Sequence, residues 1–278
     1  MKELFDNLSY EMSEMATKRY STSFSMGISF LSKDLQRPIY GIYGFVRFAD
    51  EIVDSFHGFD KATLLTDFKR QTYEAIENKI SLNPILNSFQ FAVNKYNISL
   101  EHIETFLRSM EMDLQEKTYD KENYELYILG SAEVVGLMCL KVFLRGDEEE
   151  FLRLTPSAMK LGAAFQKINF LRDLNADYKE LGRSYFPGID MTTFDKNIKQ
   201  QIEAEIELDF EAGFEGIKQL PKNARFGVYM AYKYYFVLFQ KIKSTRAQSI
   251  LEKRIRIPNN KKYQLFFTSY IRHNLNLI

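Results

Sequence analysis

Apolar residues recur every three or four positions along almost all of this 278-residue chain, and only six prolines interrupt the pattern. That spacing is the period of the α-helix, and the two-residue alternation typical of a half-buried strand is not seen. The sequence therefore predicts an all-α fold. Asp60 and Ser99 are expected to cap helix starts, because each directly precedes a helical pattern. The predicted helices cover 3–18, 36–56, 60–77, 84–95, 99–115, 122–144, 150–178, 194–217, 223–248 and 261–275.

No internal repeat, low-complexity segment or linker rich in proline or glycine divides the sequence. Helical enzymes of this length usually form one domain, so residues 1–278 are expected to form a single-domain helical bundle. Hydrophobic residues make up 45% of the chain, including 24 Phe and 17 Tyr. This is enough bulk to line a central apolar cavity as well as to fill a core.

The formal net charge of zero argues against nucleic acid as a partner, because that binding depends on neutralising phosphates. From Lys241 to the end, however, nine Lys or Arg stand against one acid, Glu252, which gives this region a net charge of +8. A basic C-terminal region of this kind suits peripheral contact with an anionic membrane surface. A solvated basic face beside an anion-binding site explains it equally well.

A single cysteine, Cys139, rules out an internal disulfide and fits a reducing cytoplasm. The first residues, MKELFDNLSYEM, lack the apolar core of a signal peptide. No run of 18 uncharged apolar residues occurs, and even 226–239 contains Lys233. We expect a cytoplasmic protein that is soluble or peripheral to a membrane.

The segment PIYGIYGFVRFADEIVDSF, residues 38–56, carries a first acidic motif. On a helix Asp50 and Asp54 lie one turn apart on one face, and Arg47 and Tyr43 continue that face toward the N-terminus. Apolar neighbours surround this stripe, so the carboxylates are expected to be partly buried. Like charges in such a place repel one another unless a cation is present, and Mg²⁺ is the natural one. The alternative is an exposed helix face with incidental acids.

The segment LGAAFQKINFLRDLNAD, residues 161–177, repeats the arrangement. Asp173 and Asp177 are again four residues apart, and Asn169 and Gln166 extend the same face. Amide oxygens are good secondary ligands for a hard cation. Arg172 sits beside this stripe, which adds a cation that a diphosphate could use.

Arg183 follows the second motif in the sequence GRSYFP and supplies another cation. Two such helices facing each other would form a negatively charged mouth that holds several Mg²⁺ ions, and these ions would grip a diphosphate. The alternative is a pair of unrelated amphipathic helices. The double motif is far more specific than either half.

These segments, in this order and at this separation, resemble those of the squalene/phytoene synthase family over nearly the whole chain. YGIYGFVRFADEIVD is similar to the family's first Asp-rich segment, and FQKINFLRDLNAD with GRSYFP is similar to its second. The resemblance implies a helical bundle of the isoprenoid synthase type. It also implies metal ligation by Asp50, Asp54, Asn169, Asp173 and Asp177.

Further roles follow from the same resemblance. Tyr43 and Arg47 match positions that hold diphosphate and shape the cavity, and they join the four aspartates as expected catalytic residues. YSTSFS, residues 20–25, is similar to the family's substrate-binding serine segment, and YILGSAEVVG, residues 127–136, to its channel-lining helix. The expected substrate-binding residues are Ser21, Ser23, Arg47, Tyr127, Val135, Gly136, Gln166, Asn169, Arg172, Arg183 and Tyr235. Asn175-Ala176 departs from the family, which often has Gly-Glu there, but Ala176 points away from the metal-facing pair.

The reaction implied is the head-to-head condensation of two prenyl diphosphates with release of diphosphate. We expect two geranylgeranyl diphosphates to give phytoene through a cyclopropylcarbinyl diphosphate, with Mg²⁺, or Mn²⁺ in its place, and without NADPH. The alternatives are a dehydrosqualene or squalene synthase that uses farnesyl diphosphate, and a non-catalytic assembly protein of the same fold. A head-to-tail prenyltransferase or terpene cyclase fits less well, because Glu51 stands where their first motif usually has a second aspartate.

Overall fold

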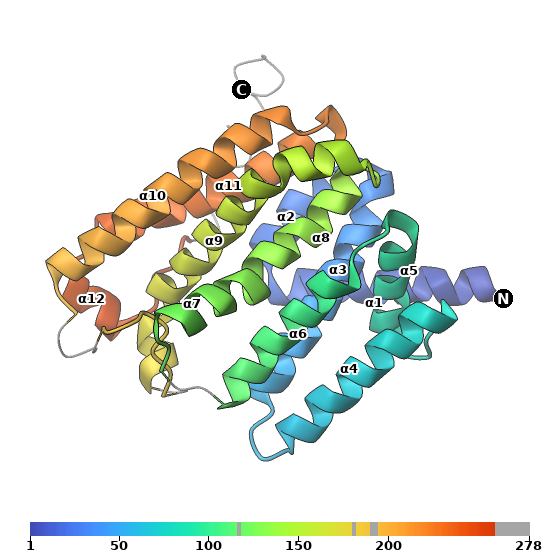
Figure 1. Ribbon diagram of the computed structural model, residues 1–278, viewed down its shortest axis with the longest axis horizontal. Coiled ribbons are helices and arrows are strands. Elements are labelled where there is room, and N and C mark those ends of the chain that lie inside the picture. The colour runs from blue at the N-terminus through green and yellow to red at the C-terminus, as the bar shows by residue number, and fades with distance from the viewer. Residues whose placement is uncertain (116–117, 180–181, 190–193, 259–278) are drawn as a thin grey trace.

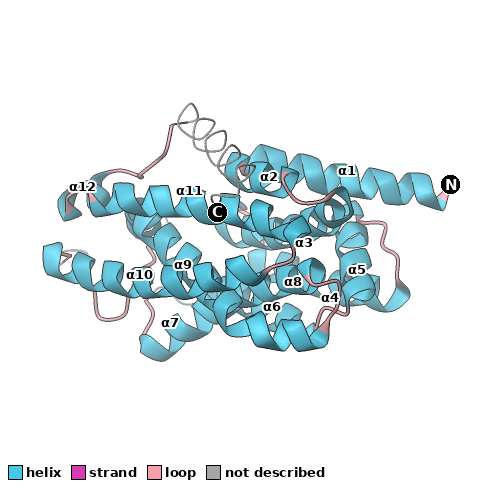
Figure 2. Ribbon diagram, turned by 90° about the horizontal axis from the view of Figure 1, so that it is seen from above, coloured by secondary structure: helices cyan, strands magenta, loops and turns pink. Residues whose placement is uncertain are grey.

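The computed structural model describes residues 1–115, 118–179, 182–189 and 194–258, and within these ranges every extended element is a helix (Figures 1 and 2). The prediction of an all-α fold is confirmed. The elements are α1 (Lys2–Tyr20), α2 (Thr22–Ser29), α3 (Lys33–Ser55), α4 (Lys61–Asn78), α5 (Pro84–Tyr96), α6 (Leu100–Gln115), α7 (Lys121–Ile128), the π-helical turn η1 (Leu129–Glu133), α8 (Val134–Phe143), α9 (Glu148–Lys179), α10 (Lys196–Gln219), α11 (Lys222–Lys243) and α12 (Ala247–Glu252).

Most predicted helices agree with these bounds to within a few residues. The Asp60 carboxylate accepts a hydrogen bond from the Thr63 N–H, and Ser99 Oγ accepts one from the Glu101 N–H, so both predicted caps are confirmed. α3 begins at Lys33, ahead of the predicted start, and continues through Pro38. The predicted helix 261–275 lies outside the described residues.

Two helical segments differ from the prediction. α2 was not predicted, and it begins where Ser21 Oγ accepts a hydrogen bond from the Phe24 N–H. The predicted helix 223–248 is in fact two helices, because α11 ends at Lys243 and α12 starts at Ala247. Between them the Ser244 and Thr245 hydroxyls both donate to the Lys241 carbonyl, which competes with continuation of the helix.

The predicted helix 122–144 contains a π-helical turn, η1, between α7 and α8. Gly130 in this turn lies against α6 so closely that a Cβ there would be 2.6 Å from the Thr105 carbonyl oxygen. The chain from α7 through α8 therefore rests directly on α6, and it needs glycine at that contact. π-Turns of this kind are frequent at functional sites.

The stretch from α7 to α8, Lys121–Phe143, is long and apolar enough to span a membrane by length and composition, with a mean hydropathy of 1.7. It contains Glu133 and Lys141, so the expectation that no run of 18 uncharged apolar residues occurs still holds. Half of the apolar window is buried inside the protein, and the core helix of a soluble protein passes the same test. Length and composition alone do not distinguish the two.

Packing among the long helices creates two large apolar clusters. One is formed by residues of α7, α9, α10, α11 and α12, and the other mainly by residues of α2, α3, α4, α5, α6 and α8. α10 packs along α9, where a Cβ on Gly213 would lie 2.9 Å from Leu161 Cβ and one on Gly216 would lie 2.5 Å from Ser157 Cβ. α3, α8, α9 and α11 lie between the outer helices (Figure 1), and the space that they enclose is the candidate site.

Candidate active site

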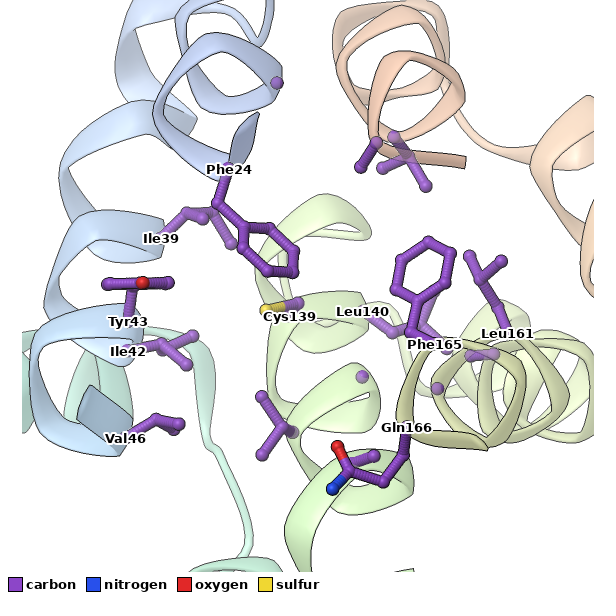
Figure 3. Close-up of a pocket in the computed structure, with 18 of the residues that line it drawn as sticks. Phe24, Ile39, Ile42, Tyr43, Val46, Cys139, Leu140, Leu161, Phe165 and Gln166 are labelled. Atoms are coloured by element: carbon purple, nitrogen blue, oxygen red, sulfur yellow. The ribbon is translucent and has the colours of Figure 1, made fainter. Parts of the chain in front are cut away.

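A deep cavity of about 390 Å³ runs between α2, α3, α8, α9 and α11. Its walls are mostly apolar, and Figure 3 shows Ile39, Ile42 and Val46 of α3 facing Leu161 and Phe165 of α9 across it. Lining residues of α9 extend from Leu154 to Asn169, which at about 1.5 Å per residue is a length of roughly 22 Å. The cavity is therefore elongated and suits a long apolar chain.

The polar lining residues gather at one end of this cavity. On α3 the series runs from Ile39 to Asp50, and on α9 it runs from Leu154 to Asn169, so both helices become polar toward their C-terminal ends. The cavity thus has an apolar interior and one polar mouth. Nine of the predicted site residues line it: Tyr43, Arg47, Asp50, Tyr127, Val135, Gly136, Gln166, Asn169 and Tyr235.

The first acidic pair carries arginine partners. Arg47 donates hydrogen bonds to the carboxylates of Asp50 and Glu51, and its guanidinium lies 4.3 Å from the centre of the Tyr20 ring. Asp54, one turn beyond Asp50, accepts a hydrogen bond of 2.7 Å from Arg183 Nη1. Each carboxylate of this pair therefore already has a cationic partner.

In the second pair, Asp173 has two arginine partners. Arg172 donates to Asp173 Oδ2 from Nη2 at 2.5 Å, and Arg254 Nε lies 2.6 Å from Asp173 Oδ1. Arg254 comes from the chain after α12, a helix that packs on α9. Sequence reasoning did not single out Arg254, and the only available signal was the basic run that surrounds it.

The pKa values of Asp50 and Asp177 indicate that the two acidic pairs interact electrostatically. Burial, followed by the charge of Asp54, raises the pKa of Asp50 to about 7. Burial, followed by the charges of Asp173 and Asp54, raises the pKa of Asp177 to about 8. The geometry agrees, since Arg183 Nη1 donates to Asp54 Oδ1 at 2.7 Å and the Arg183 N–H donates to the Asp177 carbonyl oxygen at 2.8 Å, so the ends of the two motifs lie close together.

This donor set fits a hard divalent cation, since it offers carboxylate and amide oxygens whose mutual repulsion a cation would relieve. Among the described residues, no three acidic, His or Cys side chains are grouped closely enough to hold an ion in their present positions. Arginines are bonded to Asp50, Asp54 and Asp173 instead. An ion that used the same carboxylate oxygens would displace these arginines.

The amides and tyrosines at the mouth form a small hydrogen-bonded group. Asn169 Nδ2 lies 3.4 Å from Gln166 Oε1, and the Tyr235 hydroxyl donates to Asn169 Oδ1 at 3.2 Å. The Tyr235 ring stacks on Phe165 at 4.0 Å between centroids. Asn169 is thereby oriented from two sides, as a ligand would need to be.

The serine segment lies beside the mouth. Ser21 caps α2 and hydrogen-bonds to Tyr43, whose pKa burial raises to about 12. Ser23 is buried and does not line the cavity. Of the two serines, Ser21 is therefore the one in contact with a cavity residue.

A family model described as Squalene/phytoene synthase matches residues 17–261 of the sequence. The chain belongs to the squalene/phytoene synthase family. The resemblance inferred from the two acidic motifs is thus confirmed, and the match includes both motifs and the serine segment.

Relatives in the squalene/phytoene synthase family include two groups of named enzymes. The chain is 24% identical to 4,4'-diapophytoene synthase of Staphylococcus haemolyticus over 70% of its own length and 68% of that protein. It is also 24% identical to 15-cis-phytoene synthase of Synechocystis, over 95% of its own length and 85% of the relative.

Solved structures support the fold. A dehydrosqualene synthase in complex with a ligand superposes with a TM-score of 0.82 at 23% identity, over 97% of this chain and 98% of the other. Squalene synthase HpnC from Alicyclobacillus acidocaldarius gives a TM-score of 0.73 at 21% identity, over 84% and 93%. The predicted isoprenoid synthase type of helical bundle is confirmed.

The two raised carboxylate pKa values predict an unusual pH dependence for this family member without metal. Asp50 and Asp177 keep protons in the folded state that the unfolded chain releases near pH 3.8, so folded protein binds more protons at neutral pH. Stability should therefore fall as pH rises toward about 8. We expect the melting temperature in EDTA to be a few degrees lower at about pH 8.5 than at about pH 6.5, since 1 kcal/mol corresponds to about 2–4 °C.

Thermal unfolding followed by circular dichroism checks this expectation. Saturating Mg²⁺ with inorganic diphosphate should flatten the trend, and Asp177→Asn should reduce it without metal, because each removes the repulsion. A melting temperature that is equal or higher at the alkaline pH would contradict the expectation.

Proposed function

We propose that the protein joins two prenyl diphosphates head to head in a Mg²⁺-dependent reaction, and that two geranylgeranyl diphosphates give phytoene through a cyclopropylcarbinyl diphosphate. The observation that supports the proposal is that Asp50 of the first motif and Gln166 and Asn169 of the second line the polar mouth of one long apolar cavity. Such a site separates a charged leaving group from an apolar chain that must be kept dry.

The residues that would hold Mg²⁺, or Mn²⁺ in its place, are Asp50, Asp54, Asn169, Asp173 and Asp177. When bound, the ions would neutralise the diphosphate and make it a better leaving group. Arg47 and Arg172 would then be free to donate to diphosphate oxygens, because the ions would replace them on the carboxylates. Arg183 is buried beside Asp113 and would stay there. Ser21 and Ser23 would help to bind the diphosphate, and the hydrogen bond between Ser21 and Tyr43 supports this for Ser21.

The cavity walls would handle the prenyl chains. Tyr43, Tyr127 and Tyr235 line the cavity near its mouth and present ring faces that stabilise a developing allylic cation. Val135 and Gly136 of α8 also line the cavity, and Gly136 packs closely against α9, where a Cβ would lie 3.3 Å from the Ala158 carbonyl oxygen. Holding two substrates in line in this space would turn an encounter in solution into an oriented reaction.

The names of the relatives support both chain lengths, since phytoene synthases and a diapophytoene synthase match at similar identity. Dehydrosqualene or squalene synthesis from farnesyl diphosphate is therefore the second candidate. A non-catalytic assembly protein is disfavoured, because partly buried like charges at four aspartates would only destabilise a scaffold.

The deciding experiment incubates purified protein and Mg²⁺ with farnesyl or geranylgeranyl diphosphate, with and without NADPH, and identifies the hydrocarbon by chromatography and mass spectrometry. We expect phytoene from the twenty-carbon substrate without NADPH. Squalene formed only when NADPH is present would overturn the product and the cofactor assignment together. No turnover of either substrate by folded protein would favour the assembly role.

Membrane contact and a cytoplasmic location stay proposals. Within the described part of the basic C-terminal region, several cations have partners inside the molecule: Lys241 donates to the Arg256 carbonyl oxygen, Lys243 pairs with Glu207, and Arg254 pairs with Asp173. Lys261, Lys262 and Arg272 lie outside the described residues. Any attraction to anionic lipid would depend on these three and on the exposed Arg246, Lys253 and Arg256 rather than on the paired cations. Nucleic acid is not proposed as a partner, because the chain has no net positive charge.

A further inference from the structure

Arg183 lies between the proposed metal site and the protein interior. Only 7% of its side chain is exposed, and Nη1 donates to Asp54 Oδ1 at 2.7 Å and to the Tyr185 hydroxyl at 3.3 Å. Nη2 donates to the Asp113 carbonyl oxygen at 2.9 Å and to the Val53 carbonyl oxygen at 3.5 Å. The guanidinium is thus fixed on every side, and Asp54 is its partner toward the metal site.

Asp113, near the end of α6, lies on the other side of this guanidinium. Its side chain is 2% exposed, and its Oδ1 is 3.5 Å from Arg183 Nη1. The Tyr127 hydroxyl donates to Oδ2 at 2.7 Å, and the Tyr185 and Tyr119 hydroxyls donate to Oδ1 at 3.0 and 3.3 Å. Figure 1 shows the C-terminal ends of α3, α6 and α9 at the same edge of the molecule, where these groups meet.

A buried carboxylate surrounded in this way is costly unless it has a purpose or full compensation. Asp113 does not line the cavity, and its side chain is less exposed than those of Asp50, Asp54 and Asp173. Its charged neighbour is Arg183, which carries one positive charge between two carboxylates, Asp54 and Asp113. Two carboxylates on one guanidinium have a use if one of them is at times released from Arg183.

Metal binding is the event that would make Asp54 leave. If Asp54 turned toward an ion and Asp113 were neutral, Arg183 would remain buried without a counter-charge, which is strongly unfavourable. With Asp113 present, Arg183 stays paired in both states and keeps its orientation.

We propose that Asp113 is a positioning residue for metal binding, which holds Arg183 from inside the protein so that Asp54 can be released to the ion. The inference rests on the proposed function, because it takes Asp54 to be a metal ligand. It assigns to Asp113 a role that touches neither the ion nor the substrate.

Asp113→Asn tests this role, because the amide keeps the shape of the side chain and removes its charge. Arg183 should then hold Asp54 more firmly and compete with the ion. We expect the affinity for Mn²⁺, measured by electron paramagnetic resonance with inorganic diphosphate present, to fall by about 10-fold or more, in the range found for residues that orient metal ligands. In turnover assays the Mn²⁺ concentration for half-activity should rise, while the rate at saturating Mn²⁺ recovers.

Tyr119→Phe is the matched control. It removes a hydroxyl that bonds the same Asp113 oxygen at 3.3 Å and leaves every charge in place. We expect its Mn²⁺ affinity to stay within about twofold of the original protein, the scatter typical of uncoupled changes. An equal loss in both variants would indicate a merely structural network and would overturn the proposal.

The double variant Asp113→Asn/Arg183→Gln tests whether Asp113 acts through Arg183. It can also replace Asp113→Asn if that variant does not fold, because it leaves no unpaired buried charge. Its net charge equals that of the original protein, and Asp54 has no competing guanidinium, so Mn²⁺ affinity should return to within about twofold. A loss of about 10-fold in the double variant, or no loss in a folded Asp113→Asn, would refute the role. Failure of the unmodified protein to bind Mn²⁺ with diphosphate would instead refute the proposed function itself.

Discussion

Replacing Asp50 or Asp173 with alanine is expected to abolish measurable prenyl transfer while the protein stays folded. Each change removes a carboxylate from the shared acidic mouth and leaves its arginine partner, Arg47 or Arg172, to repel a divalent cation. Losing one preorganised group that stabilises developing charge typically costs about 10²–10³-fold in rate, and loss of an ion would add to that. Hydrocarbon formation in Mg²⁺ is the measurement.

Two controls make this result interpretable. Helical circular dichroism and the melting temperature of each variant should match the original protein closely, since Asp50 lines the cavity mouth and Asp173 is partly exposed, and neither belongs to the apolar core. Asp67→Ala on α4 removes an exposed acid that pairs only with Arg70 among the ion pairs described, and should leave turnover unchanged. Loss of helicity in both site variants would mean that these aspartates are structural groups and not ligands.

Ser131→Phe is expected to have the second largest effect, because a phenyl ring at this lining position would fill part of the cavity. Ser131 lies in the π-turn η1 and lines the cavity, with its hydroxyl donating to the Tyr127 carbonyl oxygen at 2.7 Å. A phenyl ring there would occupy space needed by a prenyl chain, and displacement of a reacting group by about 1 Å can cost 10²-fold. We expect hydrocarbon formation to fall by about that factor.

The acidic mouth should survive this change, which gives the experiment its internal check. Mn²⁺ binding with inorganic diphosphate should be unaltered in Ser131→Phe, and Ser131→Ala should keep most of its turnover because it leaves the space open. Normal turnover by a folded Ser131→Phe protein would show that the prenyl chains lie elsewhere and would remove the cavity from the mechanism.

Periodicity predicted the long helices well because each buries a continuous apolar stripe, as α3 and α9 do. α2 escaped prediction because eight residues are too few to display a stripe, and its serines are typical of loops. The π-turn at Gly130 was equally hidden, since it shifts hydrogen bonds without changing the apolar pattern around it. These misses lie beside the cavity, where local hydrogen bonding and close approach outweigh pattern.

Spacing also predicted the acidic pairs, because residues four apart share a helix face whatever the tertiary structure. The partners of those acids were a different matter. Arg254 reaches Asp173 from 81 residues away, and Asp113 reads in the sequence as one more acid on an amphipathic helix. Only the packing of α6 and of the chain after α12 brings them to the site, so no local pattern could identify them. Apolar lining and apolar core were likewise indistinguishable before the cavity was located.

The arginines on Asp50, Asp54 and Asp173 have a consequence for how such a protein matures in the cell. Three of the four aspartates have arginine partners without any ion, so the protein is expected to fold before metal binds, unlike small metal-dependent domains that remain unfolded without one. A shortage of the proposed metal would then lower the activity of the protein and leave its abundance unchanged. The supply of ions would thus control activity, and the folded protein without metal would not be a target for proteolytic quality control.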